Sequence, residues 1–283
     1  MKPGLMWGIM LSAMAASGFG AERAVFTYKV GRFEVHMLVE NRGPGRPSIL
    51  IGADEGALGR YLPSGSYQSE TNTFLIRTPD RFILVDTGFG TTLFESMAAL
   101  GVRPDQIDAV LLTHLHGDHI GGLAKDGKAL FPKARVYLAE QEREYWTKTN
   151  PNPGAVAALA LYGSRVTTFK PGDLGALLQE IIPGITPIAA FGHTPGHTMF
   201  MVDSGGQKLL IWGDLMHVQD IQFPLPDVSV SYDTDPVAAA ASRKRVLEYA
   251  ARSRIPIAGM HLVYPAIGIV TVQSGGYRLT PAE

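Results

Sequence analysis

The amino-acid sequence predicts an α/β protein in which two mixed β-sheets pack face to face and helices cover their outer faces, a four-layered αββα sandwich. Two successive halves of the chain each carry short β-rich runs together with helical segments, which is the pattern of such a sandwich. The chain has 283 residues, 46% of them hydrophobic, which is enough for one large core. No Ser/Gly-rich linker and no block of like charges follows residue 21, so we expect one domain over residues 21–283.

The first half opens with short runs rich in β-branched and aromatic residues, which predict strands at Val25–Val30, Phe33–Val39, Asn72–Thr78 and Phe82–Val85. A segment from Thr91 to Leu100 then carries apolar residues at helical spacing, and Thr91 or Thr92 can cap it. The apolar run from Asp108 to Thr113 predicts one more buried strand.

The second half of the chain again combines strand and helix signals. We expect a strand at Ala134–Leu138, a helix from about Ala139 to Trp146, and further strands near Ile185, Met199, Leu209 and Ile257. A helix from Pro236 to Ala251 begins with proline in its first turn, and Asp235 can cap it.

Two segments carry neither a strand nor a helix signal. Asn41–Ser69 is rich in Gly and Pro, and Thr147–Ser164 is also punctuated by them and has few charges. Loops of this length commonly cover a binding site. We therefore expect both segments to form walls of the substrate pocket.

The N-terminus is typical of an export signal. Lys2 supplies a positive charge, Leu5–Ala16 is an apolar stretch, and Gly18-Phe19-Gly20 is a small-x-small cleavage site. The alternative is a retained membrane anchor, but the apolar stretch is shorter than the roughly twenty residues that span a bilayer. We expect residues 1–20 to be a signal peptide, the mature protein to be periplasmic or secreted, and no membrane association after cleavage.

Charge and cysteine content exclude several classes of protein. The formal net charge is −1 at pH 7, which gives no electrostatic argument for binding nucleic acid or an anionic membrane. The chain has no cysteine. It therefore has no disulfide, and no thiolate can bind a metal.

The most informative segment is Thr113–Gly122, which reads THLHGDHIGG. Neutral imidazole and carboxylate are the ligands that zinc and similar ions prefer, so His114, His116, Asp118 and His119 predict a metal site. The alternative, a polar loop that happens to contain histidines, leaves the clustering unexplained. In an extended segment residues i and i+2 point to the same side, so His114 and His116 can bind one ion. Asp118 and His119 follow the Gly117 turn and can bind a second.

Three later strands end in further candidate ligands. His197 lies in the turn Gly192–Thr198 after the apolar run Gly184–Ala190, Asp214 follows Lys208–Gly213, and His261 follows Pro256–Met260. Ligands commonly gather at the carboxyl ends of strands.

These motifs resemble the metallo-β-lactamase superfamily in its dinuclear hydrolase form. The resemblance implies that His114, His116 and His197 bind one metal, that Asp118, His119 and His261 bind the other, and that Asp214 bridges the two. It also implies the αββα fold. The stretches Gly213–His217, Gln222-Phe223, Arg243-Lys244 and His261–Gly268 resemble the branch of methyl parathion hydrolases and lactonases.

The expected cofactors are two divalent ions per chain. Zn²⁺ is the default for His and Asp ligands, and Mn²⁺, Fe²⁺ or Co²⁺ also fit a site without sulfur. Two such ions can share a bridging water and lower its pKa to around 7, which makes a hydroxide nucleophile. Asp118 is the candidate catalytic residue, because besides binding metal it can carry the proton to the leaving group.

Six other residues have predicted roles around the metals. The resemblance implies that Asp86 orients a ligand histidine, although it could instead cap the Thr87-Gly88 turn. We expect His193 to brace its loop, and His217 either contacts a ligand or lies in a solvated loop. Trp146, Phe89 and Phe223 are the candidates for the substrate pocket, Trp146 above the others.

These observations predict an exported dinuclear hydrolase in which hydroxide attacks a lactone or carboxylic ester, including lactones of the quorum-signal type. The alternative substrate is a phosphotriester, as in methyl parathion hydrolase. A β-lactamase is disfavoured because Asp214 occupies the position where those enzymes commonly use Cys. A sulfur dioxygenase and a non-catalytic binding module are further alternatives. The expected partner is a small-molecule substrate, and related enzymes suggest a homodimer.

Overall fold

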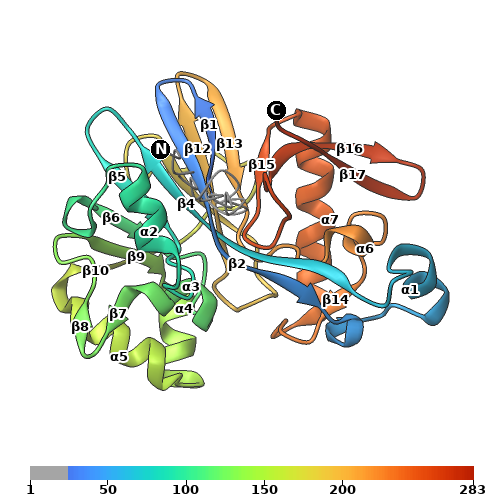
Figure 1. Cartoon of the computed structure of the whole chain (residues 1–283), viewed down its shortest axis with the longest axis horizontal. Coiled ribbons are helices and arrows are strands. Elements are labelled where there is room, and N and C mark those ends of the chain that lie inside the picture. The colour runs from blue at the N-terminus through green and yellow to red at the C-terminus, as the bar shows by residue number, and fades with distance from the viewer. Residues whose placement is uncertain (1–24) are drawn as a thin grey trace, which may run out of the picture.

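We describe a computed structural model of the chain, in which residues 25–283 are placed. Two sheets of seven and six strands lie face to face, with helices on the outside of each (Figure 1). The predicted αββα sandwich is confirmed. The signal peptide predicted at residues 1–20 lies outside the described residues. No helix between residues 25 and 283 has both the length and the apolar character needed to cross a bilayer.

The first sheet has the strand order β1-β2-β4-β5-β6-β9-β10. Neighbours from β1 to β5 are antiparallel, whereas β5, β6, β9 and β10 run parallel. Parallel strands bring their carboxyl ends to one edge, and that edge carries part of the site described below. The strands are β1 Val25–Val30, β2 Phe33–Gly45, β4 Tyr67–Arg77, β5 Phe82–Val85, β6 Ala109–Leu111, β9 Arg135–Ala139 and β10 Val166–Phe169.

The second sheet has the order β11-β12-β13-β15-β16-β17, and its one parallel pair is β13 with β15. Its strands are β11 Ile185–Ala189, β12 Thr198–Ser204, β13 Gln207–Ile211, β15 Ile257–Ala258, β16 Ile267–Gln273 and β17 Gly276–Pro281. Two small sheets pair β3 Leu50–Ile51 with β14 Ser229–Val230, and β7 Ala124–Lys125 with β8 Lys128–Ala129.

Helices cover the two outer faces. On the first sheet lie α2 Leu93–Ala99, α3 Gly117–Ile120, α4 Glu140–Glu144 and α5 Pro153–Tyr162, and on the second lies α7 Pro236–Ser253 (Figure 1). Helices α1 Glu55–Tyr61 and α6 Gln219–Gln222 lie beside each other near β17. Short 3₁₀ turns span Pro47–Ile49, Pro104–Gln106, Gly121–Leu123 and Gly163–Arg165, and a π turn spans Tyr145–Thr149.

The alternation of side chains along each strand divides the core into layers. In β4, Phe74 and Ile76 pack between the sheets, whereas Leu75 packs with Leu93 and Met97 of helix α2. Successive residues of a strand face opposite sides, so both faces of β4 are buried. A slip of one residue would exchange the two faces, so the pairing of β4 with β2 and β5 decides which side chains enter which layer.

The predicted helix at residues 236–251 is confirmed, and the Asp235 carboxylate caps it by accepting from the backbone N–H groups of Val237 and Ala238. The helix after Thr91 also forms, but neither threonine caps it as predicted. The hydroxyls of Thr91 and Thr92 donate to backbone carbonyls of strand β2 instead. These hydroxyls tie the loop after β5 to β2.

Both segments predicted to be irregular contain regular structure. In Asn41–Ser69, strands β2 and β4 continue as a long antiparallel pair past Gly43 and Pro44, with an irregularity after Val39, and helix α1 forms with its N-terminus capped by Asp54. In Thr147–Ser164, Asn152 caps helix α5 and Pro153 occupies its first position. The pairing of β2 with β4 offsets the weak strand propensity of Gly and Pro in the first segment, and the capping side chains stabilise the first turns of helices α1 and α5.

Candidate metal centre

The predicted ligands come from loops that leave the carboxyl ends of four strands. His114 and His116 follow β6, and Asp118 and His119 come next in the single turn of α3. His197 follows β11, Asp214 follows β13, and His261 follows β15. Strands β6 and β13 belong to different sheets, so the site lies across one end of the sandwich. Residues far apart in sequence are thereby brought within a few ångströms of each other.

The first group of converging side chains is His114, His116, His193 and Asp214. His114 Nε2 lies 3.0 Å from His116 Nδ1, and His193 Nε2 lies 3.2 Å from His114 Nε2 and 3.0 Å from His116 Nδ1. The Asp214 carboxylate is 3.3 Å from His193 Nε2 and 3.6 Å from His114 Nε2. Three imidazole nitrogens and a carboxylate oxygen therefore surround one point.

The second group is Asp118, His119, Asp214 and His261. His119 Nε2 lies 3.2 Å from Asp214 Oδ1 and 3.6 Å from Asp118 Oδ2. His261 Nε2 lies 3.1 Å from Asp214 Oδ2 and 3.4 Å from Asp118 Oδ2. Asp214 belongs to both groups, as a bridging ligand must.

The donor set fits two divalent ions. His119 Nε2 and Asp214 Oδ1 are buried and make no hydrogen bond. Leaving such groups without a partner costs about 1–3 kcal/mol each, and a metal ion is the partner that removes this cost for a carboxylate and an imidazole lone pair together. Nitrogen and oxygen donors without sulfur suit Zn²⁺ and the neighbouring first-row ions.

The second ring nitrogen of four ligand histidines is held by the protein, which leaves Nε2 free for metal. The His119 Nδ1–Asp86 Oδ2 distance is 2.7 Å, and His193 Nδ1 lies 2.8 Å from Asp233 Oδ1. His261 Nδ1 donates to the carbonyl of Glu70 over 2.8 Å, and His114 Nδ1 lies 3.0 Å from the hydroxyl of Thr113. These contacts orient the rings before any ion binds.

Burial and neighbouring carboxylates together set the charge of the first group. Desolvation lowers the pKa of His114 well below its usual value and that of His116 to about 3, so both rings are neutral and present lone pairs. Burial would also lower the pKa of His193, but Asp214 and Asp233 raise it, so a metal ion bound here has to displace the proton of that ring. Burial would raise the pKa of Asp214, but the surrounding histidines, His119 first, hold it well below its usual range.

The structure corrects the prediction for His197 and His193. His197 is in neither group: its Nδ1 donates to the carbonyl of Ala190 over 3.0 Å, and its Nε2 accepts the backbone N–H of Asp214 over 2.9 Å. His193, predicted to brace its loop, points into the first group instead. The two histidines of the Gly192–Thr198 turn have thus exchanged their predicted positions, because the ring of His197 is fully engaged by backbone groups.

Asp86 is placed as the resemblance implies. Its carboxylate contacts His119 and accepts from the backbone N–H of Thr113 over 2.8 Å and from the Thr113 hydroxyl over 2.7 Å. It does not cap the Thr87-Gly88 turn. His217 contacts ligand residues and does not lie in a solvated loop. It is buried, its Nε2 lies 3.2 Å from Asp214 Oδ2, and its ring stacks on the ring of His261.

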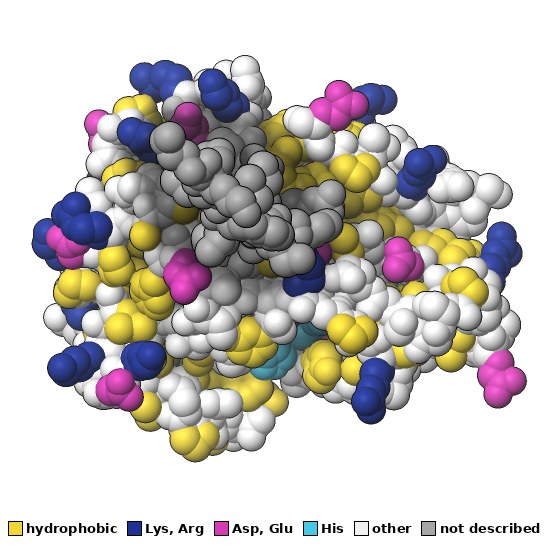
Figure 2. Space-filling view, viewed as in Figure 1, with side chains coloured by type: hydrophobic (Ala, Val, Ile, Leu, Met, Phe, Trp, Pro, Cys, Tyr) yellow, Lys and Arg dark blue, Asp and Glu magenta, His cyan; other side chains and the backbone are white. Residues whose placement is uncertain are grey.

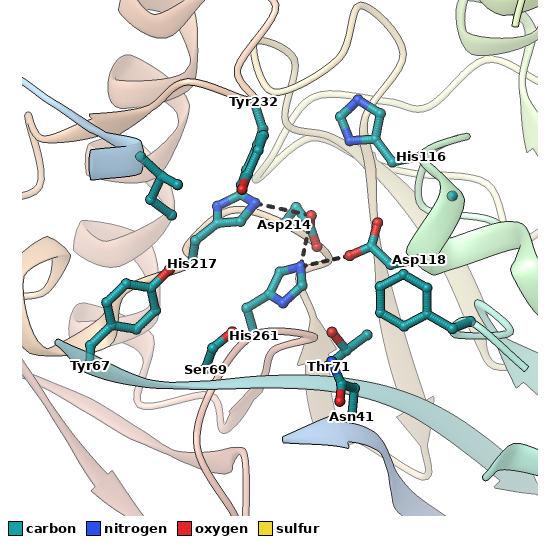
Figure 3. A pocket seen from close by; sticks show the side chains of 13 residues that line it. Asn41, Tyr67, Ser69, Thr71, His116, Asp118, Asp214, His217, Tyr232 and His261 are labelled. Carbon is teal, nitrogen blue, oxygen red and sulfur yellow. Dashed lines mark hydrogen bonds and ion pairs between the residues drawn. The ribbon is translucent and has the colours of Figure 1, made fainter. Parts of the chain in front are cut away.

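A cavity of about 440 Å³ opens above the second group. Figure 3 shows Tyr67 and Tyr232 on the side of His217, with His116 and Asp118 opposite them. In the space-filling view histidine side chains lie at the base of a hollow with hydrophobic side chains around it (Figure 2). The lining residues are Asn41, Ile49, Tyr67, Ser69, Thr71, Phe89, His116, Gly117, Asp118, Asp214, His217, Tyr232 and His261.

The structure places the three pocket candidates in different surroundings. Phe89 lines the cavity, but Phe223 does not, because it is buried in the core against Trp212. Trp146 is also absent from the lining. Its indole N–H donates to Glu142 Oε1 and its ring lies edge-on to His116. Asn41–Ser69 does form a wall, whereas Thr147–Ser164 contributes no lining residue.

Sequence reasoning missed two features of the site. Tyr67, Ser69 and Thr71 all face the cavity, and their spacing of two is that of one face of a strand. This signal was hidden because the segment was interpreted as a loop. Asp233, the partner of His193, lies 40 residues further along the chain, and nothing in the local sequence marks it.

Comparison with known proteins agrees with this geometry. The family model described as the metallo-beta-lactamase superfamily matches residues 67–253, which include every ligand of both groups except His261.

Two solved structures resemble the chain over nearly its whole length. The hydrolase AbOPH, of the β-lactamase superfamily, is 28% identical with a TM-score of 0.83, and the match covers 93% of this chain and 99% of that one. AidC, a dizinc quorum-quenching lactonase in complex with the product N-hexanoyl-L-homoserine, is 27% identical with a TM-score of 0.82, and the match covers 92% of this chain and 98% of that one.

Curated relatives match over shorter regions. A hydroxyacylglutathione hydrolase of Aeromonas hydrophila is 32% identical over 146 residues, which cover 50% of this chain and 45% of that protein. A probable metallo-hydrolase of Mycobacterium bovis is 26% identical over 189 residues, which cover 52% and 56%. The chain thus spans about half the length of the curated relatives it matches.

Proposed function

We propose that this chain, which belongs to the metallo-β-lactamase superfamily, is a metal-dependent hydrolase that cleaves lactones or carboxylic esters with two metal ions. The observation that carries the proposal is the pair of ligand groups that share Asp214 beneath an open cavity. Zn²⁺ is the proposed metal, since the donors are imidazole and carboxylate and a dizinc lactonase has the same fold.

The proposed reaction divides its work between metal and protein. Two divalent ions in these groups would lower the pKa of a shared water to around 7 and polarise the carbonyl that is attacked. The protein holds the ligand rings in place through Asp86, Asp233 and the Glu70 carbonyl. Fixed ligands leave little reorganisation for the moment of reaction.

Asp118 is the proposed proton carrier. It lines the cavity, and its side chain keeps 23% of its exposure whereas that of Asp214 keeps 2%. A carboxylate at this position can accept a proton from the attacking water and return it to the oxygen of the leaving alkoxide. In a lactone that oxygen stays attached to the product, so the proton completes the ring opening.

The cavity wall supports a substrate with an apolar part. Ile49 and Tyr67 from one segment face the same cavity as Phe89 and Tyr232. Phe89 is 46% exposed and Tyr232 is 54% exposed, so both rings can contact a ligand at the mouth. Rings and an isoleucine suit an acyl chain or an aryl group.

A panel of substrates tests the proposal. Zinc-loaded protein is assayed with an acyl-homoserine lactone, dihydrocoumarin, a nitrophenyl ester, methyl paraoxon and a cephalosporin. We expect the lactones or the ester to give the highest kcat/KM, and Asp118→Asn to lower their kcat by about 10²–10⁴-fold. Turnover of methyl paraoxon alone would identify a phosphotriesterase, and turnover of the cephalosporin alone would contradict the argument from Asp214.

We also propose that residues 1–20 direct export. The support is the sequence of this segment, with Lys2 before an apolar stretch and small residues at positions 18 and 20. Intact-mass measurement of the protein from a periplasmic fraction tests this. A chain that begins at Ala21 is expected, and an uncleaved chain found in the cytoplasm would contradict it.

A further inference from the structure

Glu142 is a buried carboxylate outside both ligand groups and outside the cavity lining. It is in helix α4, directly after the carboxyl end of β9, and its side chain has no exposed surface. Strand β9 runs parallel to β6, the strand that leads into His114. The two strands therefore deliver Glu142 and the first metal ligands to the same edge of the sheet.

Both oxygens of Glu142 accept two hydrogen bonds. Oε1 accepts from the backbone N–H of Leu115 over 2.9 Å and from the indole N–H of Trp146 over 2.6 Å. Oε2 accepts from the hydroxyl of Thr194 over 2.7 Å and from the backbone N–H of Gly196 over 2.9 Å. Four donors on two oxygens use the full accepting capacity of a carboxylate.

Three of the four donors belong to the loops that carry the first ligand group. Leu115 lies between His114 and His116, and Thr194 follows His193 directly. Trp146 adds a contact of its own, since its ring lies edge-on to His116 with a centroid separation of 5.4 Å. One carboxylate thus joins the loop after β6 to the loop after β11.

Close packing supports the same conclusion. A Cβ atom on Gly196 would collide with the backbone and side chain of Glu142. The loop that carries His193 therefore rests directly on helix α4, and glycine permits this approach.

Two opposing effects act on the charge of Glu142. Burial raises its pKa, whereas its four hydrogen bonds lower the pKa and favour the ionised form. No Lys or Arg between residues 25 and 283 forms an ion pair with it, so the four donors are what compensates the buried carboxylate. The second group has other supports, namely Asp86 for His119 and the Glu70 carbonyl for His261.

We propose that Glu142 is a positioning residue of the first metal site, and that it holds the loops of His114, His116 and His193 at binding distance while leaving the second site unaffected. The inference rests on the proposed dinuclear centre. Residues that orient metal ligands typically contribute about 10–100-fold to affinity. Loss of Glu142 should therefore weaken one site of the two by that factor.

The test is a titration of the chelator-treated protein with Co²⁺, followed by visible absorption. Glu142→Gln keeps the size of the side chain but replaces one accepting oxygen with an NH₂ group, which only donates. In either orientation of the amide this NH₂ group faces two of the four donors, so two hydrogen bonds are lost. Glu140→Gln is the matched control, because Glu140 lies in the same helix, is exposed and contacts only Lys170 at 3.7 Å. His116→Ala and His261→Ala supply reference spectra for proteins that keep the second or the first site.

We expect the wild type and Glu140→Gln to bind two equivalents of Co²⁺. Glu142→Gln should bind one equivalent normally and the other about 10–100-fold more weakly, and its spectrum at one equivalent should match that of His116→Ala. Equal weakening of both sites, or no weakening, would overturn the inference. A wild type that binds no Co²⁺ would instead overturn the dinuclear centre itself.

A second variant keeps the inference testable if Glu142→Gln does not fold. Thr194→Val removes one donor to Oε2 and keeps the shape of the side chain. It should weaken the first site alone, by less than Glu142→Gln would. Normal binding of both equivalents by Thr194→Val, with a folded near-ultraviolet circular dichroism spectrum, would contradict a role for this hydrogen-bond network in metal binding.

Discussion

The exchange of His193 and His197 gives the sharpest prediction, because two histidines four residues apart should respond differently to the same change. His193→Ala removes a ring whose Nε2 lies 3.0 Å from His116 Nδ1 and 3.3 Å from Asp214. His197→Ala removes a ring that bonds only backbone groups, the carbonyl of Ala190 and the N–H of Asp214. The first variant should lose metal from one site, and the second should keep both metals and lose stability only.

The size of the metal effect follows from the number of ligands. Four-ligand structural zinc sites bind with about 10–16 kcal/mol. An equal share for each of the four groups around the first site is about 3 kcal/mol, which is roughly a 100-fold loss of affinity. At micromolar protein, a loss of this size should empty the first site during dialysis against a weak chelator.

The size of the stability effect follows from buried hydrogen bonds. Removing the His197 ring leaves the Asp214 N–H and the Ala190 carbonyl without partners inside the protein, at about 1–3 kcal/mol each. The cavity left by a fully buried ring adds to this cost. We expect a fall in the free energy of unfolding of about 3–5 kcal/mol.

The assay combines metal analysis by mass spectrometry after dialysis with urea unfolding of the metal-free proteins. His193→Ala should retain about one metal per chain, whereas His197→Ala should retain two. Both should unfold at lower urea than the wild type, because His193 is also buried and is bonded to the buried Asp233. The reverse result, with metal lost from His197→Ala alone, would refute the ligand assignment and restore the one that the sequence resemblance implied.

Three further predictions concern the surroundings of the site. Asp86→Asn should weaken the second metal site about 10–100-fold, because Asp86 holds His119 Nδ1 at 2.7 Å; a Co²⁺ titration measures this, and unchanged affinity would contradict it. Phe89→Ala should raise KM for long-chain esters while changing kcat by less than about twofold, because Phe89 lines the cavity and is in neither ligand group. Steady-state kinetics measure this, and a fall in kcat with constant KM would contradict it. Arg243→Met should lower the free energy of unfolding by about 2–4 kcal/mol. The reason is that the buried guanidinium donates to the carbonyls of Pro226 and Leu215 and to the hydroxyl of Ser229. A urea unfolding curve that matches the wild type would disprove this.

Most of the site could be predicted from sequence because its signals are local. His114 and His116 are two residues apart in an extended segment, so they must face the same side. Asp214 and His261 each follow a short apolar run that could only be a buried strand. Strand ends and ligand residue types together therefore located the two groups without any structure.

The choice between His193 and His197 could not be made locally. Both lie in one turn, and both are fully buried or nearly so. Which ring points to the metals depends on Asp233, which comes from the loop before helix α7 and holds His193 Nδ1 at 2.8 Å. The local sequence carries no information about this contact.

The conformation of the pocket walls could not be predicted locally for a related reason. Gly and Pro in Asn41–Ser69 are typical of a loop, yet long-range pairing of β2 with β4 keeps that segment extended and points Tyr67 into the cavity. Trp146 was predicted to face the substrate, but its indole N–H is bonded to Glu142. Long-range strand pairing therefore set the conformation of the first segment, and a buried hydrogen-bond partner set the direction of Trp146.

We propose that two metal ions bound across Asp214 make this chain a hydrolase. Elemental analysis of the purified protein counts these ions. We predict close to two divalent ions per chain in the wild type, and loss of both in Asp214→Ala, because Asp214 belongs to both ligand groups. A wild-type protein that is folded and hydrolytically active without metal would contradict the claim.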